Sequence, residues 1–291
     1  MVRLIVSLFS RLSLTALYRW SDWLLFPLIY YVVRYRRRIT RLNLTNSFPD
    51  KTAAEIVQLE KQFYHHFADV IVEIIWSYRA THEQMREHIH FENVEAMEQW
   101  THLRQGTVFM LGHMGNWEWL PEIQQHYQDP AIQHYNVYRR QKNAAVDRLM
   151  LQLREQRSGK DCNIEKNDLV RRLIAIKHSG RLFTLGLVSD QKASPKNVFH
   201  RTMFLHQDTG FLGGGEVLSR KLGFAVCYLN IVQLSRGVYR CRFDLITTDP
   251  ASLEQGELTE RYARQLEQNI REQPFLWLWT HNRWKWEHLQ Q

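Results

Sequence analysis

One histidine and one glutamate, His113 and Glu118, lie five residues apart in the stretch TVFMLGHMGNWEWL, residues 107–120. The apolar run that ends at Leu111 predicts a short buried strand just before the histidine. Asn116 then predicts a helix N-cap, which places the glutamate in the first helical turn. A histidine after a strand can act as a general base near neutral pH, and a nearby carboxylate can fix its tautomer. The spacing also fits a polar loop with a structural histidine, because the chain contains 14 His.

Three further polar residues, Arg139, Asn143 and Asp190, are predicted to follow strands at the same edge of a sheet. Ligand sites of open α/β sheets lie outside the carboxyl ends of the strands, where these side chains would gather around His113. Arg139 and Asn143 suit the binding of a phosphate or a carbonyl group. An ion pair of that arginine with Asp147 or Asp190 is the structural alternative. Asp190 suits a bound arginine or a substrate amine, and equally a structural cap or ion pair.

Several catalytic and cofactor-binding motifs are absent from the sequence. It contains no HExxH, no Cys/His set with zinc-ligand spacing, no GxSxG nucleophile motif and no P-loop. The three cysteines, Cys162, Cys227 and Cys241, are too few and too scattered for a disulfide framework. We therefore predict chemistry that uses a histidine base and needs no metal or organic cofactor.

The elements that would position these residues alternate between strands and helices. A capping box from Thr52 to Glu55 predicts the start of a long helix. The apolar pattern beyond it predicts strands at 89–93, 108–111, 135–139, 163–165, 181–188, 202–205, 225–233 and 239–247, and helices at 95–104, 143–156, 168–178, 216–222 and 258–272. This alternation predicts an α/β fold with a mixed, mostly parallel central sheet flanked by helices. The chain length fits one such domain, residues 43–291, with an appendage formed by residues 1–42.

Residues 1–42 form an apolar and basic segment. They contain eight Arg and one acid, Asp22, so they carry +7 of the net charge of +8. A nucleic-acid-binding body would spread its basic residues over the fold, so this distribution argues against one. The apolar stretch 12–33 and the basic run RYRRRITR at 34–41 predict one membrane helix with a cytoplasmic exit, which either spans a bilayer or lies in its interface. An amphipathic helix docked on the domain is the alternative.

The ordered set of motifs resembles the bacterial lipid A late acyltransferases, the lauroyl/myristoyl transferase family. HMGNWE at 113–118 is similar to the His-x4-Asp/Glu box of glycerolipid-type acyltransferases, and VYRRQKNAAVD, VSDQ, FLGGGEVLSRK and QPFLWLWTHNRWK follow in the order of this family. The resemblance covers nearly the whole chain. It implies an acyltransferase domain on the cytoplasmic face of a bacterial inner membrane, held by a single N-terminal membrane helix. One departure is Arg140, which stands where the family usually has Pro.

The reaction implied by the resemblance is acyl transfer to a lipid hydroxyl. His113 would deprotonate the 3-hydroxyl of an acyl chain on a lipid A precursor, Glu118 would orient the imidazole, and the alkoxide would attack a thioester on acyl carrier protein. Arg139 or backbone N–H groups of the loop would hold the oxyanion. The predicted substrate-binding residues are Arg139, Asn143, Asp190 and Asn116. The expected partners are acyl carrier protein, landing on the basic run 34–41, the lipid A precursor and membrane phospholipids, with no nucleic acid.

Two other functions remain open at this point. A lysophospholipid or amino-lipid acyltransferase would keep the same histidine and glutamate, but the Phe-Pro-Glu-Gly-Thr block usual in that family is absent. A catalytically inactive, membrane-tethered lipid-binding protein would need neither residue, and the presence of both His113 and Glu118 counts against it.

Overall fold

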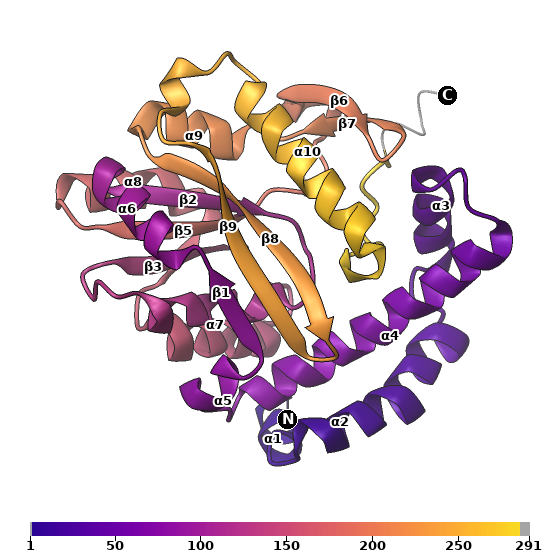
Figure 1. Cartoon of the computed structure of the whole chain (residues 1–291). Helices are drawn as coiled ribbons and strands as arrows, with labels where there is room; N and C mark the ends of the chain where they lie inside the picture. Colours follow the sequence, from indigo (N-terminus) through magenta and orange to yellow (C-terminus); the bar gives the residue numbers. More distant parts are fainter. Residues whose placement is uncertain (1, 286–291) are drawn as a thin grey trace.

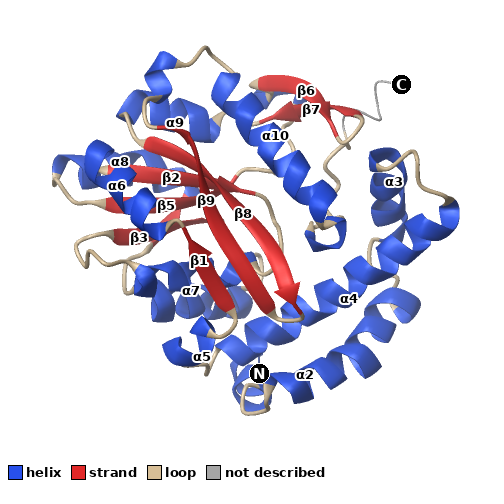
Figure 2. Ribbon diagram, viewed as in Figure 1, coloured by secondary structure: helices blue, strands red, loops and turns tan. Residues whose placement is uncertain are grey.

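A central seven-stranded sheet organises residues 2–285, the part of the chain that the computed structural model describes. Its strands in chain order are β1 (Ile89–Glu92), β2 (Gly106–Leu111), β3 (Gln133–Tyr138), β4 (Asn163–Glu165), β5 (Phe183–Val188), β8 (Ala225–Ser235) and β9 (Val238–Thr247). Their spatial order is β1-β9-β8-β2-β5-β3-β4, and only the β8–β9 pair of this sheet is antiparallel (Figure 2). A separate antiparallel hairpin joins β6 (His200–Phe204) to β7 (Gln207–Phe211). The prediction of an α/β fold with a mostly parallel sheet is confirmed.

Helices join the strands and cover the sheet (Figure 1). The α-helices are α1 (Val2–Phe9), α2 (Leu14–Trp20), α3 (Arg37–Ser47), α4 (Ala53–Ser77), α5 (His82–Arg86), α6 (Val94–Arg104), α7 (Ala144–Ser158), α8 (Leu169–His178), α9 (Gly214–Leu222) and α10 (Glu257–Glu272). The 3-10 helices are η3 (Trp117–His126), η4 (Lys166–Asp168), η5 (Pro195–Asn197), η6 (Pro250–Ser252) and η7 (Pro274–Leu276). α6, α9 and α10 contact the central strands, whereas α7 and α8 contact the β3–β4 edge. The predicted capping box of Thr52 and Glu55 begins α4.

The sheet brings the ends of β2 and β5 together. β2 is buried along its whole length and lies between β5 and β8, as the continuous apolar run of a central parallel strand predicts. Leu111 of β2 is in register with Val188 of β5. Two residues farther on, His113 and Asp190 therefore emerge side by side. β3 lies on the far side of β5, so at about 4.8 Å per strand Arg139 follows a strand about 10 Å from β2.

The N-terminal segment is a bent helical arm that lies along α4 (Figure 1). α2 continues through two π-helical turns, η1 (Ser21–Leu25) and η2 (Leu28–Val32), which flank Pro27. A proline inside a helix removes a backbone donor, and π turns accommodate such an interruption. The inner face of the arm buries Leu17, Phe26 and Tyr30 in the same core as the sheet.

None of the helices within residues 2–285 combines the length and the apolar character that crossing a bilayer requires. The prediction of a single N-terminal helix that spans a membrane, and of the localisation that rests on it, is therefore wrong. The physical reason is that the arm is bent and amphipathic. Its polar residues find partners on the domain, as where Asp22 accepts two hydrogen bonds from Arg236 in the β8–β9 turn.

Candidate active site

His113 and Asp190 form a hydrogen-bonded pair at the carboxyl edge of the sheet. Nδ1 of His113 lies 2.6 Å from Oδ1 of Asp190, and the backbone N–H of His113 donates to Oδ2 over 2.9 Å. The indole N–H of Trp277 donates to the same Oδ2 over 2.8 Å. An ionised carboxylate only accepts, so Nδ1 carries the ring proton and Nε2 is left as the basic nitrogen. This is the arrangement that a histidine general base needs.

The charges around His113 favour its protonated form. Burial alone lowers the pKa of the imidazole, but the carboxylates of Asp190 and Glu118 outweigh burial and raise the pKa above 6.5. Burial opposes ionisation of Asp190 as well, yet the contacts with His113 hold the pKa of that carboxyl well below its usual range. Nearby His281 behaves differently, because burial lowers its pKa to about 4. Of these two histidines, only His113 has its pKa raised rather than lowered.

The C-terminal segment 274–284 holds this pair in place. The backbone N–H of Leu278 donates to the carbonyl of His113 over 3.1 Å. The guanidinium of Arg283, which is buried, donates to the backbone carbonyl of Asp190. Together with the Trp277 indole, these contacts fasten both residues of the pair to one segment. The aromatic block near the end of the sequence is therefore part of the site.

Glu118 lies in η3 and binds Arg154 of α7. Nε and Nη2 of Arg154 donate to both carboxylate oxygens over 2.8–3.0 Å, which makes the pair bidentate. The sequence predicts that Glu118 orients the imidazole of His113, but in the structure Asp190 makes that contact instead. The reason is the 3-10 helix, which begins at Trp117 and directs the glutamate toward α7. Glu118 still acts on His113 electrostatically, by raising its pKa.

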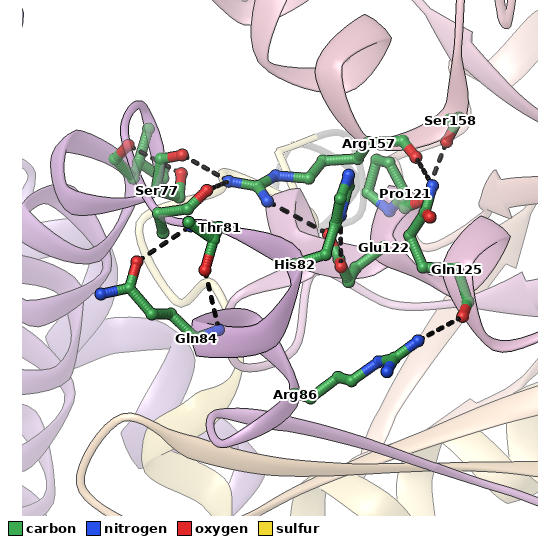
Figure 3. Close-up of polar contacts among 12 residues, drawn as sticks. Ser77, Thr81, His82, Gln84, Arg86, Pro121, Glu122, Gln125, Arg157 and Ser158 are labelled. Carbon is green, nitrogen blue, oxygen red and sulfur yellow. Dashed lines mark hydrogen bonds and ion pairs between the residues drawn. The ribbon is translucent and has the colours of Figure 1, made fainter.

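A second arginine–carboxylate pair lies one turn farther along η3 and α7 (Figure 3). Arg157 donates to Glu122 over 3.3 Å. It also donates to the backbone carbonyls of Ser77, the last residue of α4, and of Ala80, which follows that helix. Nδ1 of His82 lies 2.7 Å from the other oxygen of Glu122. Arg157 and Glu122 are both buried. The two pairs, Glu118–Arg154 and Glu122–Arg157, clamp η3 onto α7, and we call them the η3–α7 clamp.

Asn116 does not cap the helix that follows it, contrary to the prediction. Its backbone conformation, φ −102° and ψ 75°, lies outside the extended range of an N-cap, and its side chain makes no capping hydrogen bond. Instead Nδ2 donates over 2.9 Å to the carboxylate of Glu73 in α4. Asn116 is buried, so the predicted contact with a substrate stays a prediction.

Arg139 and Asn143 lie in the exposed loop between β3 and α7. The Asn143 side chain caps α7 by accepting from the N–H groups of Ala145 and Val146. The guanidinium of Arg139 is exposed, and within residues 2–285 no acidic side chain pairs with it. Arg140 does pair, with Glu165 over 3.1 Å. Of the predicted loop residues, Arg139 is therefore the one with a charge available to a ligand.

A cavity of about 420 Å³ lies apart from these residues, between the N-terminal arm, α4 and the β8–β9 turn. It is lined by Asp22, Gln62, His65, His66, Asp69, Gln233, Arg236 and Phe275, and none of these belongs to the predicted site. Among the side chains that the structure describes, no group of three His, Cys, Asp or Glu residues is arranged to hold a metal ion.

Four residues around the site, Glu73, Arg154, Arg157 and Trp277, are not among the candidate site residues predicted from the sequence. Glu73 has the clearest signal, because it interrupts the apolar run VIVEIIW with a charge. Arg154 and Arg157 are three residues apart, and the two glutamates that they bind, Glu118 and Glu122, are four apart. This similar spacing has meaning only once the fold brings η3 and α7 together. Trp277 stands among other aromatic residues of the tail, and its role follows from the position of Asp190.

No curated protein matches the chain. A family model described as bacterial lipid A biosynthesis acyltransferase matches residues 23–286, which include the second part of the bent arm, the sheet, the His113–Asp190 pair and the segment that holds them. The sequence blocks that resemble this family are those that the fold assembles around β2 and β5. The chain belongs to the bacterial lipid A biosynthesis acyltransferase family.

Proposed function

We propose that the protein transfers a fatty acyl chain from acyl carrier protein to a hydroxyl group of a lipid A precursor, with His113 as the general base. The observation that carries the proposal is the ring geometry of His113. Nδ1 is bound to a buried carboxylate, so Nε2 is the nitrogen that can accept a proton from the acceptor hydroxyl. Family membership supplies the acyl-transfer chemistry and the lipid A-type acceptor.

Nε2 of His113 takes up one proton and releases it again in the course of the reaction. His113 takes the proton of the acceptor hydroxyl, and the oxygen attacks the thioester carbonyl to form the new ester C–O bond. The C–S bond then breaks, and the proton on Nε2 passes to the leaving thiolate. Asp190 stabilises the imidazolium between these two steps, as the carboxylate of a catalytic triad does.

The developing oxyanion needs donors that are not already engaged. The N–H groups of His113, Met114 and Gly115 all donate within the protein, the first to Asp190 and the others to backbone carbonyls. Arg139, by contrast, has a free guanidinium in the loop after β3. This favours Arg139 over those three N–H groups as the oxyanion donor.

The acidic carrier protein requires a basic landing area near His113, and the run 34–41 supports one. Arg36 donates to the carbonyl of Thr280, which places the run against the C-terminal segment of the site. Arg37 and Arg41 are used internally, because both bind the buried Glu60. Arg34 and Arg38 are exposed and remain for a partner.

We expect the double variant R34E/R38E to raise KM for the acyl carrier protein substrate by about tenfold at low salt, since long-range charge attraction promotes encounter. Its kcat should stay near the wild-type value. The matched control is R171E/R172E, which reverses two exposed charges on α8. An unchanged KM in R34E/R38E, or an equal rise in the control, would exclude this landing area.

The lipid acceptor requires contact with a lipid surface, and the outer face of the N-terminal arm supports such contact. The exposed large apolar residues of the arm are Leu8, Leu12, Trp20, Trp23, Leu24, Leu28, Tyr31 and Val32, and Val33, Tyr35 and Leu42 follow it in the chain. An amphipathic helix of this kind, rich in Trp and flanked by Arg, can lie in the headgroup region without crossing a bilayer.

The deciding experiment is mass spectrometry of lipid A from cells with and without the protein. Addition of one acyl chain, lost again in the H113A variant, is the expected result. Lipid A of unchanged mass together with altered phospholipid acyl chains would instead favour the lysophospholipid alternative. Unaltered acyl transfer by H113A would remove the catalytic role of His113.

A further inference from the structure

Glu73 is a buried carboxylate at a meeting point of three elements. It lies in α4 with no exposed surface, and its two oxygens accept hydrogen bonds from three side chains. The hydroxyl of Tyr18 in α2 donates over 2.8 Å, the hydroxyl of Tyr239 in β9 over 2.9 Å, and Nδ2 of Asn116 over 2.9 Å. The first partner belongs to the N-terminal arm, and the last belongs to the loop that carries His113.

No cation compensates this carboxylate within the part of the chain that the structure describes. All three of its hydrogen-bond partners are neutral, and burial raises the pKa of Glu73 to about 7. A buried charge without an ion pair is costly, and an apolar residue on this apolar helix would avoid the cost. What the carboxylate contributes at this position is the simultaneous binding of three hydrogen-bond donors.

On the loop side, Glu73 fixes the side chain of Asn116. In its ionised form Glu73 only accepts from the amide, so Nδ2 faces α4, and among residues 2–285 the buried Oδ1 has no hydrogen-bond partner. The loop backbone is held from the opposite side, where Gly115 donates to the carbonyl of Leu276 over 3.1 Å. The segment 113–116 is thus fixed between α4 and the C-terminal segment.

On the arm side, Tyr18 is closely fitted. Its hydroxyl lies so near Gly237 that a Cβ on that glycine would stand 1.9 Å from it. The adjoining contacts of the arm are Ser21 to Asp69 over 2.6 Å, and Arg236 to both Asp69 and Asp22. Seating of the arm and completion of the Glu73 cluster therefore occur together.

We propose that Glu73 is a positioning residue that couples the N-terminal arm to the His113 loop through Tyr18 and Asn116. The inference rests on the proposed acyl transfer and extends it, because the surface that meets lipid and the loop that carries the base share one carboxylate. When the arm lifts, Glu73 loses the Tyr18 hydrogen bond, and the hold on Asn116 weakens. An arm seated on α4 keeps the loop in its active geometry.

The test compares Y18F, E73Q and the matched control Y64F. Tyr64 also joins the N-terminal residues to α4 through a buried hydroxyl, which bonds Thr40 and the carbonyl of Tyr35, but it does not touch Glu73. We expect Y18F to lower kcat about fivefold, because it removes one hydrogen bond that contributes about 1 kcal/mol. KM for both substrates should stay within twofold of the wild-type value. E73Q should lower kcat further, and Y18F should add nothing in the E73Q background. Y64F should leave kcat unchanged.

Amide hydrogen exchange of residues 112–119 provides a readout that does not depend on activity. Exchange should rise in Y18F and E73Q and stay at the wild-type level in Y64F. Equal exchange in Y18F and Y64F, or additive effects of Y18F and E73Q on kcat, would overturn the coupling. If the wild-type protein transfers no acyl chain, the proposed function fails, while the exchange experiment still decides whether the arm and the loop are coupled.

Discussion

At the scale of single residues, two carboxylates act on His113 in different ways. Asp190 binds Nδ1 directly, whereas Glu118 is neutralised by Arg154 and acts through space. The first contact fixes the tautomer and the ring position, and the second only shifts the protonation equilibrium. Substitutions at the two positions should therefore have effects that differ in kind as well as in size.

We predict that D190N lowers kcat by about 10²- to 10⁴-fold, because the ring loses both its fixed tautomer and the charge that stabilises the imidazolium. In the proposed mechanism the base is neutral His113, so activity should fall as pH decreases through its raised pKa. Removing the Asp190 charge lowers that pKa, and the acidic limb of the kcat/KM profile should move to lower pH. E118Q should move the same limb in the same direction by less. A larger displacement in E118Q than in D190N would reverse our assignment of the two roles.

Sequence spacing locates His113 at a strand end but selects the wrong carboxylate to orient it. The HMGNWE motif suggests Glu118 because it is near in the chain, whereas the partner, Asp190, lies 77 residues later, just after β5. The sequence places Asp190 at the same sheet edge as His113, but it does not show that β2 and β5 are neighbouring strands. The direct contact of Asp190 with Nδ1 therefore appears only in the structure. Trp277 is unpredictable for the same reason.

At the scale of elements, the η3–α7 clamp fixes the helix that follows the catalytic loop. We predict that R157A lowers the free energy of unfolding by about 3–5 kcal/mol, since it leaves the buried carboxylate of Glu122 without its charged partner. The control R171A removes an exposed pair with Asp168 and should change stability by less than about 0.5 kcal/mol. Chemical denaturation of both variants measures the difference. Similar losses would mean that the buried pair does not fasten η3.

The burial of Glu73 in α4 makes stability depend on pH. The pKa is about 7 in the folded protein against 4.5 ordinarily, so the folded state binds more protons between these values. Proton binding to Glu73 therefore stabilises the folded state below pH 4.5, and this stabilisation, on the order of 3 kcal/mol, is lost as pH rises through 7. E73Q has no such proton. Relative to wild type, E73Q should gain stability between pH 4.5 and pH 8, as measured by urea denaturation. The groups that face Glu73 in the folded protein are Tyr18, Tyr239, Asn116 and the charge of Asp69.

Most strands and helices follow from the apolar periodicity of the sequence, and the exceptions have physical causes. The capping box at Thr52 and the buried run at 108–111 predict α4 and β2 because local signals suffice there. Asn116 fails as a helix cap because Glu73, 43 residues away, binds its side chain. The arm fails as a membrane helix because its apolar residues divide between a face that packs on α4 and a face that is exposed, a division that composition alone does not reveal.

At the scale of the whole molecule, the exposed face of the arm predicts binding to lipid vesicles. Trp23 is 84% exposed and lies in the arm, while Leu103 is 67% exposed and lies in α6. We expect W23E to reduce sedimentation with anionic vesicles severalfold, because it removes apolar area and adds a repelled charge, and L103E to bind as wild type does. Both side chains are exposed, so the thermal midpoint should hardly change in either. Equal binding by wild type and W23E would exclude this face as the lipid contact.

The C-terminal segment also imposes an order of events on the making of this enzyme. A chain emerges from the ribosome in sequence order, so His113 and Asp190 exist together long before Trp277 and Arg283 are joined to them. Until those last residues dock, Asp190 lacks its indole donor and its backbone carbonyl lacks the guanidinium. The proposed base is therefore fully supported only after the C-terminal segment 274–284 has docked.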